Sequence, residues 1–151
     1  MNWLFQDPEG VDRRALDARF ALAFPVSDKL AGVYMTLEPG AVRELHWHAN
    51  AAEWAYMIDG RARVTTIDPE NQAEVVDFWA GDVWYFPRGH GHSIQGLDGG
   101  CTFVLVFDNG YFSEFGTFSI TDWLGHTPHE VLAKNFGLPV SAFANFPDHE
   151  V

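Results

Sequence analysis

Short segments rich in Val, Ile, Phe, Tyr, Trp and Thr, separated by Pro-Gly, Asp-Gly and Gly-Gly turns, fill the chain from about residue 20 to 118. β-branched and aromatic residues favour strands and Gly and Pro end them, so the pattern is typical of an all-β sandwich or barrel. Asp59-Gly60 predicts a tight hairpin, because Gly takes the positive φ that such a turn needs. The expected strands cover residues 20–26, 31–38, 43–48, 53–59, 61–68, 73–79, 83–86, 92–97 and 101–107.

The C-terminal residues follow a different pattern. Thr127-Pro128-His129-Glu130 has the sequence of a helix-capping box with Pro in the first turn, and Gly137 follows EVLAKNF as a helix stop. A short helix is expected there, outside the barrel. No repeat or linker interrupts the sequence, so we expect one domain over residues 1–151, with a barrel at about 20–118 and a helical tail at about 119–151.

Composition narrows the class of protein. A chain of 151 residues that is 47% hydrophobic can fill one core. No run approaches the ~20 apolar residues of a membrane helix, and MNWLFQDPEG lacks the order of a secretory signal, so a cytoplasmic protein that binds no membrane is expected. A net charge of -12 disfavours nucleic acid as a partner.

Cys101 is the single cysteine of the chain, which excludes an internal disulfide and a cysteine-based zinc site. It stands in the run CTFVLVF, where period-two alternation puts Cys101, Phe103, Leu105 and Phe107 on one strand face. We therefore expect this face to line the barrel interior, with Cys101 as a small buried hydrophobe.

Three histidines and one glutamate carry the chemical signal. His46 and His48 are two residues apart in a predicted strand, so both imidazoles point to one face. Glu53 begins the next strand, where hairpin pairing is expected to bring it beside them, and His92 opens a later strand of the same barrel. Three imidazoles and a carboxylate suit Mn(II), Fe(II), Co(II), Ni(II) or Zn(II), with coordination positions left open.

A His-x-His pair alone is common on exposed strands, but here it is part of a longer pattern. The sequence reads Gly40-x5-His46-x-His48-x4-Glu53-x6-Gly60, then Gly81-x5-Pro87-x-Gly89-x2-His92. Both halves resemble the cupin signature. The stretches RELHWH, AEWAYMIDGRARVT, GDVWYFPRGHGHSIQGL, FVLVFDNGYFSE and TDWLGHTPHEVLAKNFG further resemble the N-terminal cupin half of bacterial oxalate decarboxylases.

This resemblance implies a double-stranded β-helix, the jelly-roll barrel of cupins, with a short C-terminal helical segment. It implies a manganese-dependent conversion of oxalate to formate and CO2 that requires dioxygen as co-reactant. It implies His46, His48, Glu53 and His92 as metal ligands. The small carboxylate substrate would be the main binding partner.

The resemblance also assigns residues around the metal. Arg43 matches the arginine that holds oxalate. Without the resemblance, Arg43 would be read as a surface charge on a strand. Glu114 matches the glutamate of a mobile lid that supplies the proton to the product. Without the resemblance, Glu114 would be read as a solvated loop residue. Trp84, Leu105, Phe107 and Thr117 match positions that line the substrate pocket.

The chain departs from the decarboxylase pattern in several places. The connection from His48 to Glu53 is one residue longer, and Ser113-Glu114-Phe115-Gly116 replaces the lid sequence Ser-Glu-Asn-Ser. One cupin domain stands in place of two, so a homodimer that imitates the two-domain arrangement is expected. His90 is either an extra ligand or a loop residue beside the pocket. His126, His129 and His149 have no ligand spacing.

Several functions remain open on this sequence. Retention of Glu114 favours decarboxylation, because without a proton donor the intermediate is more readily oxidised. An oxalate oxidase that makes hydrogen peroxide is the first alternative. Another cupin enzyme acting on a small carboxylic acid, such as a metal-dependent dioxygenase or isomerase, is the second. A non-enzymatic cupin that binds a metal or small molecule is the third.

Overall fold

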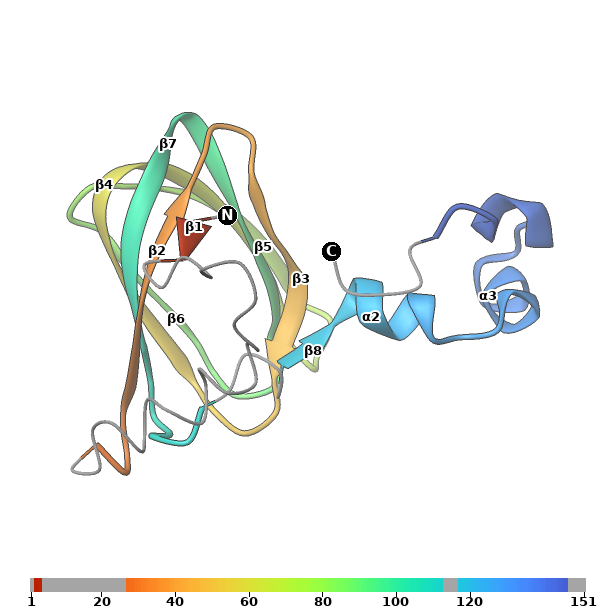
Figure 1. The fold of residues 1–151 in the computed structure, drawn as a ribbon, viewed down its shortest axis with the longest axis horizontal. Coiled ribbons are helices and arrows are strands. Elements are labelled where there is room, and N and C mark those ends of the chain that lie inside the picture. The colour runs from red at the N-terminus through yellow and green to blue at the C-terminus, as the bar shows by residue number, and fades with distance from the viewer. Residues whose placement is uncertain (1, 4–26, 113–116, 147–151) are drawn as a thin grey trace, which may run out of the picture.

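The computed structural model describes residues 2–3, 27–112 and 117–146. They form one eight-stranded antiparallel sheet that closes into a barrel (Figure 1). The strands are β1 (Asn2–Trp3), β2 (Ala31–Leu37), β3 (Val42–His48), β4 (Glu53–Ile67), β5 (Ala73–Trp79), β6 (Val83–Phe86), β7 (Gly91–Phe107) and β8 (Thr117–Ser119). The all-β prediction is confirmed. The strand expected at 20–26 lies outside the described residues.

Two long strands organise the barrel. β7 pairs with β2, β3 and β4, while β4 also pairs with β5 and β6. Each of them is one continuous strand where the sequence predicts two. Both bend around the barrel instead of ending, so each pairs with different neighbours along its length.

The predicted hairpin at Asp59-Gly60 is wrong. Gly60 has a φ of 78°, but it lies within β4 and pairs with Cys101, between two register shifts of the β4–β7 ladder. A Cβ atom at Gly60 would lie 2.1 Å from the carbonyl oxygen of Gly100. The glycine is therefore needed for close backbone approach where two long strands bend together, not for a two-residue turn.

The barrel interior follows the predicted alternation. Cys101, Phe103, Leu105 and Phe107 all face inward and are buried, as expected. Burial raises the pKa of the Cys101 thiol to about 11, so this cysteine stays protonated and behaves as a small hydrophobe. The side chains from β2, β4 and β7 thus meet in one core.

The C-terminal segment is helical and lies to one side of the barrel (Figure 1). It contains α2 (Ile120–Gly125), α3 (His129–Phe136) and the 3-10 helix η2 (Val140–Phe143), of which the sequence predicted α3 alone. Gly137 ends α3 in the left-handed conformation, as expected. None of the helices in these described ranges is long and apolar enough to cross a membrane.

The predicted capping box at Thr127 is wrong. Pro128 is the N-cap residue of α3, and it makes no side-chain capping bond. The Thr127 hydroxyl instead donates to the carbonyl of Trp123 at 2.6 Å, which closes the end of α2. Thr127 therefore caps the C-terminal end of α2 and not the N-terminal end of α3.

Candidate metal centre

β3 supplies two histidines to the barrel interior. His46 and His48 are both 3% exposed, which confirms that they share one face. Arg43 is also buried, although it lies three residues before His46 and strict alternation would place it outside. The β3–β7 ladder shifts register between Arg43 and His46, and this β-bulge turns both side chains inward.

Glu53 reaches the histidines by a different route from the one predicted. β3 and β4 do not pair with each other, so hairpin pairing does not bring Glu53 to the site. Glu53 pairs instead with Phe86 and Phe107, and its side chain points across the interior toward β3. In the connection before it, Ala51 and Ala52 are buried.

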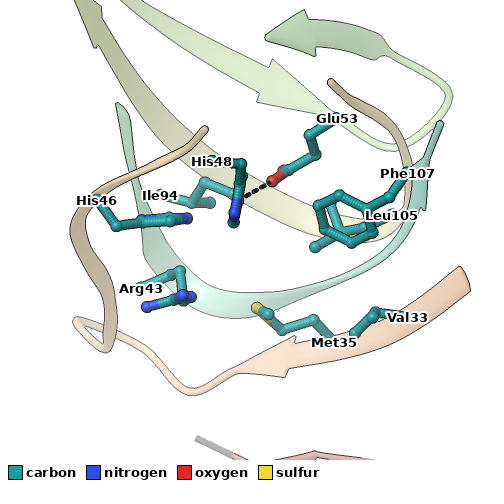
Figure 2. A pocket seen from close by; sticks show the side chains of 9 residues that line it. All are labelled: Val33, Met35, Arg43, His46, His48, Glu53, Ile94, Leu105 and Phe107. Carbon is teal, nitrogen blue, oxygen red and sulfur yellow. Dashed lines mark hydrogen bonds and ion pairs between the residues drawn. The ribbon is translucent and has the colours of Figure 1, made fainter. Parts of the chain in front are cut away.

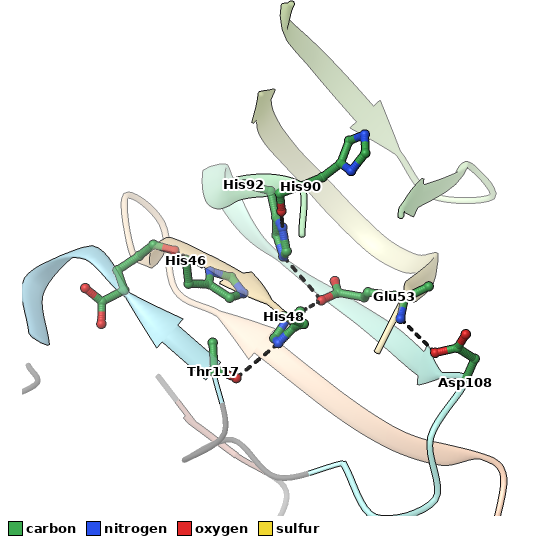
Figure 3. A network of polar contacts seen from close by, with 9 residues as sticks. His46, His48, Glu53, His90, His92, Asp108 and Thr117 are labelled. Atoms are coloured by element: carbon green, nitrogen blue, oxygen red, sulfur yellow. Dashed lines mark hydrogen bonds and ion pairs between the residues drawn. The ribbon is translucent and has the colours of Figure 1, made fainter. Parts of the chain in front are cut away.

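His92 lies beside the first pair, as expected, because β7 pairs with β3 at His46 and His92. One ligand atom from each of His46, His48, Glu53 and His92 lies within 4.8 Å of the others (Figure 3). The Glu53 Oε2 atom is 3.1 Å from His48 Nε2 and 3.4 Å from His92 Nε2. All four side chains are buried, so the group sits inside the barrel.

The second ring nitrogen of each histidine is held by another group. His46 Nδ1 lies 2.6 Å from the carbonyl oxygen of Glu44, and His92 Nδ1 lies 2.9 Å from that of His90. A carbonyl only accepts, so both rings donate through Nδ1 and keep an Nε2 lone pair for a ligand. His48 Nδ1 lies 3.1 Å from the Thr117 hydroxyl, which can donate or accept.

The charge state of the group suits a cation. Burial, together with the positive charge of Arg43, lowers the pKa of His46 to about 2. Burial also lowers the pKa of His48. Burial alone would raise the pKa of Glu53, but the surrounding contacts, of which the hydrogen bond from His48 is the largest, outweigh that effect and hold this pKa below its usual range. Near neutral pH, His46 and His48 are uncharged and the carboxylate is ionised, as metal binding requires.

Two buried polar atoms of the group have no hydrogen-bond partner, namely Glu53 Oε1 and His92 Nε2. Leaving such atoms unsatisfied inside a protein costs about 1–3 kcal/mol each. A divalent cation between three nitrogens and one carboxylate would satisfy both atoms and balance the carboxylate charge. The residues present therefore fit a transition metal.

A cavity adjoins the group, and Arg43, Leu105 and Phe107 line it as the sequence predicts (Figure 2). Its other lining residues are Val33, Met35, His46, His48, Glu53 and Ile94. Trp84 is not among them, since its ring packs against Phe78 at 5.1 Å and Phe103 at 5.4 Å.

The remaining predicted residues lie around this site. Thr117 contacts His48 without lining the cavity. His90 contributes its carbonyl, and its side chain is outside the ligand group. His126 caps the end of α2 through the carbonyl of Asp122. Glu114 and His149 lie outside the described residues.

Sequence reasoning missed the apolar cavity residues Val33, Met35 and Ile94, and it missed Glu44. Its carbonyl orients His46, and its carboxylate accepts a hydrogen bond from the Thr121 hydroxyl on α2. No spacing rule identifies a residue that acts through its backbone. Only the bulge shows that this carbonyl faces the ring.

Comparison with known proteins agrees with this fold and site. The cupin family profile matches residues 21–142. The chain therefore belongs to the cupin family. Oxalate decarboxylase OxdC of Bacillus subtilis strain 168 is 56% identical over 126 residues, which cover 83% of this chain and 32% of that protein.

A probable oxalate decarboxylase of Arthroderma benhamiae is 42% identical over 120 residues, 79% of this chain and 30% of the relative. The structure of Bacillus subtilis oxalate decarboxylase at pH 4.6 superposes with a TM-score of 0.83 at 53% identity, over 87% of this chain and 34% of that one. Another structure of that enzyme, with the same scores, comes from work on its Mn(II) centres. The predicted resemblance is confirmed, and the chain spans about a third of the length of these relatives.

Proposed function

We propose that this protein is a manganese-dependent carboxy-lyase that converts oxalate to formate and CO2. The observation that carries the proposal is the buried group of three histidines and one glutamate, with Arg43 in the same cavity. Identity of 56% to an oxalate decarboxylase supports the choice of reaction. Because the chain spans a third of that relative, the activity is assigned to this chain as a proposal.

His46, His48, Glu53 and His92 would hold Mn(II), which supplies Lewis-acid binding of a carboxylate and one-electron chemistry with dioxygen as co-reactant. Arg43 is 5% exposed, and its planar guanidinium suits a bidentate contact with the second carboxylate of oxalate. The apolar walls from Leu105 and Phe107 exclude water, which strengthens these charge interactions.

The reaction breaks the carbon–carbon bond of oxalate. One carboxylate leaves as CO2, and the carbon that remains takes a proton to become formate. We assign this proton to Glu114 from its match to the decarboxylase lid sequence. If the proton is not delivered, dioxygen can oxidise the same carbon to a second CO2 and be reduced to hydrogen peroxide, which is the oxidase outcome.

The test is the yield of formate and of peroxide from manganese-loaded protein given oxalate in air at mildly acidic pH. Formate with little peroxide supports the decarboxylase, whereas peroxide with little formate supports the oxidase. Absence of both products contradicts the proposal and favours another small acid or a binding protein. Glu114→Ala should keep manganese and lose formate, and unchanged formate output would remove Glu114 from this role.

We further propose that two copies of the chain pair through the outer face of β2, β7, β4 and β6. Trp54 of β4 lies between Val106 of β7 and Tyr85 of β6, while Tyr56 lies between Val104 and Val83. The large exposed members of this face are Tyr34, Trp54, Tyr56, Val83 and Tyr85. A contiguous apolar face of this kind marks an interaction site.

A second copy is the occupant that we propose for this face. Each copy carries a net charge of -12, so close approach is least unfavourable where both surfaces are neutral, and these face residues are all uncharged. Sedimentation velocity should give a dimer for the native chain and a monomer for Trp54→Glu. A native monomer at micromolar concentration would contradict this pairing and leave the proposed reaction untouched.

A further inference from the structure

The β-bulge in β3 sets the geometry of the candidate metal centre. β3 pairs with β7 at Arg43 with Ile94, and next at His46 with His92. Two residues of β3, Glu44 and Leu45, therefore oppose one residue of β7. The extra residue reverses the alternation, which brings Arg43 and His46 to the same interior. A bulged segment lacks the regular ladder that fixes carbonyl directions elsewhere in a sheet.

Glu44 occupies this bulge and makes two contacts of different kinds. Its carbonyl oxygen accepts from His46 Nδ1 at 2.6 Å, which fixes the ring so that Nε2 is left for a metal. Its side-chain carboxylate accepts from the hydroxyl of Thr121. Thr121 is the second residue of α2, so the contact crosses from the barrel to the C-terminal helical segment.

A second set of contacts holds α2 in place to make this bond. β8 pairs with β3 at His46 with Ser119, and Ser119 is both buried and the N-cap of α2. On the outer side, Trp47 stacks on Phe118 with ring centroids 5.1 Å apart and meets Trp123 edge-on at 5.8 Å. These contacts hold α2 beside the bulge and so fix the position of Thr121 relative to Glu44.

We propose that Glu44 and Thr121 form a positioning pair that orients His46, so that α2 is a working part of the metal centre. The inference rests on the proposed metal site and adds to it. The Thr121–Glu44 bond restrains the bulge, the restrained bulge aims the Glu44 carbonyl, and that carbonyl aims the imidazole. Neither residue contacts the metal or the substrate in this account.

The experiment measures manganese affinity and the electron paramagnetic resonance spectrum of the bound ion in paired variants. Thr121→Val keeps the side-chain shape and removes the donor, and Glu44→Ala removes the acceptor. Loss of an outer contact to a ligand lowers metal affinity by about 10–100-fold, so both variants should bind Mn(II) at least about 10-fold more weakly. The zero-field splitting of the remaining bound ion should also change, because His46 is less well fixed.

Conservative variants serve as the matched controls. Thr121→Ser keeps the donor and Glu44→Gln keeps an acceptor, so both should retain affinity within about twofold and an unchanged spectrum. Thr65→Val removes an exposed threonine of β4 whose side chain points out of the barrel, and it should also have no effect. Glu44→Ala and Thr121→Val lie on different elements, so failure of one to fold leaves the other to give the answer.

Native affinity and native spectra in both Thr121→Val and Glu44→Ala would overturn the positioning role and leave the proposed metal site intact. Equal loss in the conservative and the disruptive variants would also overturn it, since the hydrogen bond would then not be the cause. If the native protein binds no Mn(II), the proposed function fails together with the inference, and that result is distinct from the first two.

Discussion

The two ends of the barrel interior are equally buried but opposite in character. At one end Arg43, His46, His48, Glu53 and His92 are at most 5% exposed. At the other end, where β4 and β7 bend, Leu37, Met57, Ala62 and Phe103 are fully buried. The same strand β4 contributes to both ends, with Glu53 at its start and Met57 four residues later.

The apolar end stabilises the fold, whereas the polar end lowers the stability of the metal-free protein. Apolar area removed from water contributes about 25 cal/mol per Å², so the bend end holds the barrel together. The polar end buries ionisable groups and unsatisfied atoms at a cost, which a bound cation would offset. Substitutions at the apolar end should therefore lower the free energy of unfolding and leave manganese affinity unchanged. Substitutions of the ligands at the polar end should do the reverse.

The largest expected effect is on folding, at the apolar end. Phe103→Ala removes a fully buried ring and should lower the free energy of unfolding by about 3–5 kcal/mol. Urea denaturation of the metal-free protein measures this. Under conditions where the variant is folded, its manganese affinity should stay within about twofold of native. A large loss of affinity would show that the two ends are coupled.

His92→Ala at the polar end should instead lose manganese with little loss of stability. This variant loses one of four ligands, so manganese occupancy should fall to background when measured by metal analysis after dialysis. The metal-free variant should lose much less stability than Phe103→Ala, because the deleted ring has an unsatisfied nitrogen in the metal-free protein. Full occupancy would exclude His92 as a ligand.

Acid should destabilise the metal-free protein through the polar end. The folded protein keeps His46 neutral down to a pKa of about 2, whereas the unfolded chain protonates it near the usual 6.5. Below pH 6.5 the unfolded state therefore binds more protons, and stability falls as pH decreases, by about 1.4 kcal/mol per pH unit for each such imidazole.

His48 adds to this loss, and Glu53 adds below its usual pKa of 4.5, since its own pKa is lowered on folding. Thermal unfolding of the metal-free protein between pH 7.5 and 5 checks the slope. His46→Gln should reduce the slope, with the contribution of His48 remaining, while an apolar-end variant such as Met57→Leu should leave it unchanged. A native slope in His46→Gln would contradict a buried, neutral His46.

The smallest expected effect concerns the substrate contact. Arg43→Lys keeps the charge but loses the planar fork, so KM for oxalate should rise about 10-fold, which corresponds to about 1.4 kcal/mol. Manganese affinity should change less than twofold, because Arg43 is not a ligand. Steady-state kinetics and a binding titration on the same preparation separate these two readings. A loss of metal instead would make Arg43 part of the metal-holding structure.

The sequence indicates the four residues of the metal-binding group because His46 and His48 alternate on one strand and the cupin-like spacing adds Glu53 and His92. His46 and His48 follow period two, and Gly40, Gly81 and Gly89 lie in turns between strands. The barrel and its inward face in CTFVLVF follow from the same alternation. These features are local, so a single sequence carries them.

What the sequence could not predict depends on pairing between distant segments. Arg43 faces inward because of a bulge that is visible only against β7. Asp59-Gly60 has a hairpin sequence, yet Gly60 is needed for its approach to Gly100 in the neighbouring strand. Glu44 acts through its carbonyl, and every residue has one. Each of these features needs the position of a partner strand.

The most direct test of this account is an anomalous difference map from crystals grown with Mn(II). The account predicts one strong peak per chain, within about 2.0–2.4 Å of the Nε2 atoms of His46, His48 and His92 and of a Glu53 carboxylate oxygen. An absent peak, or a peak elsewhere on the molecule while these four side chains keep their metal-free contacts, would contradict the assignment of the polar end as a metal centre.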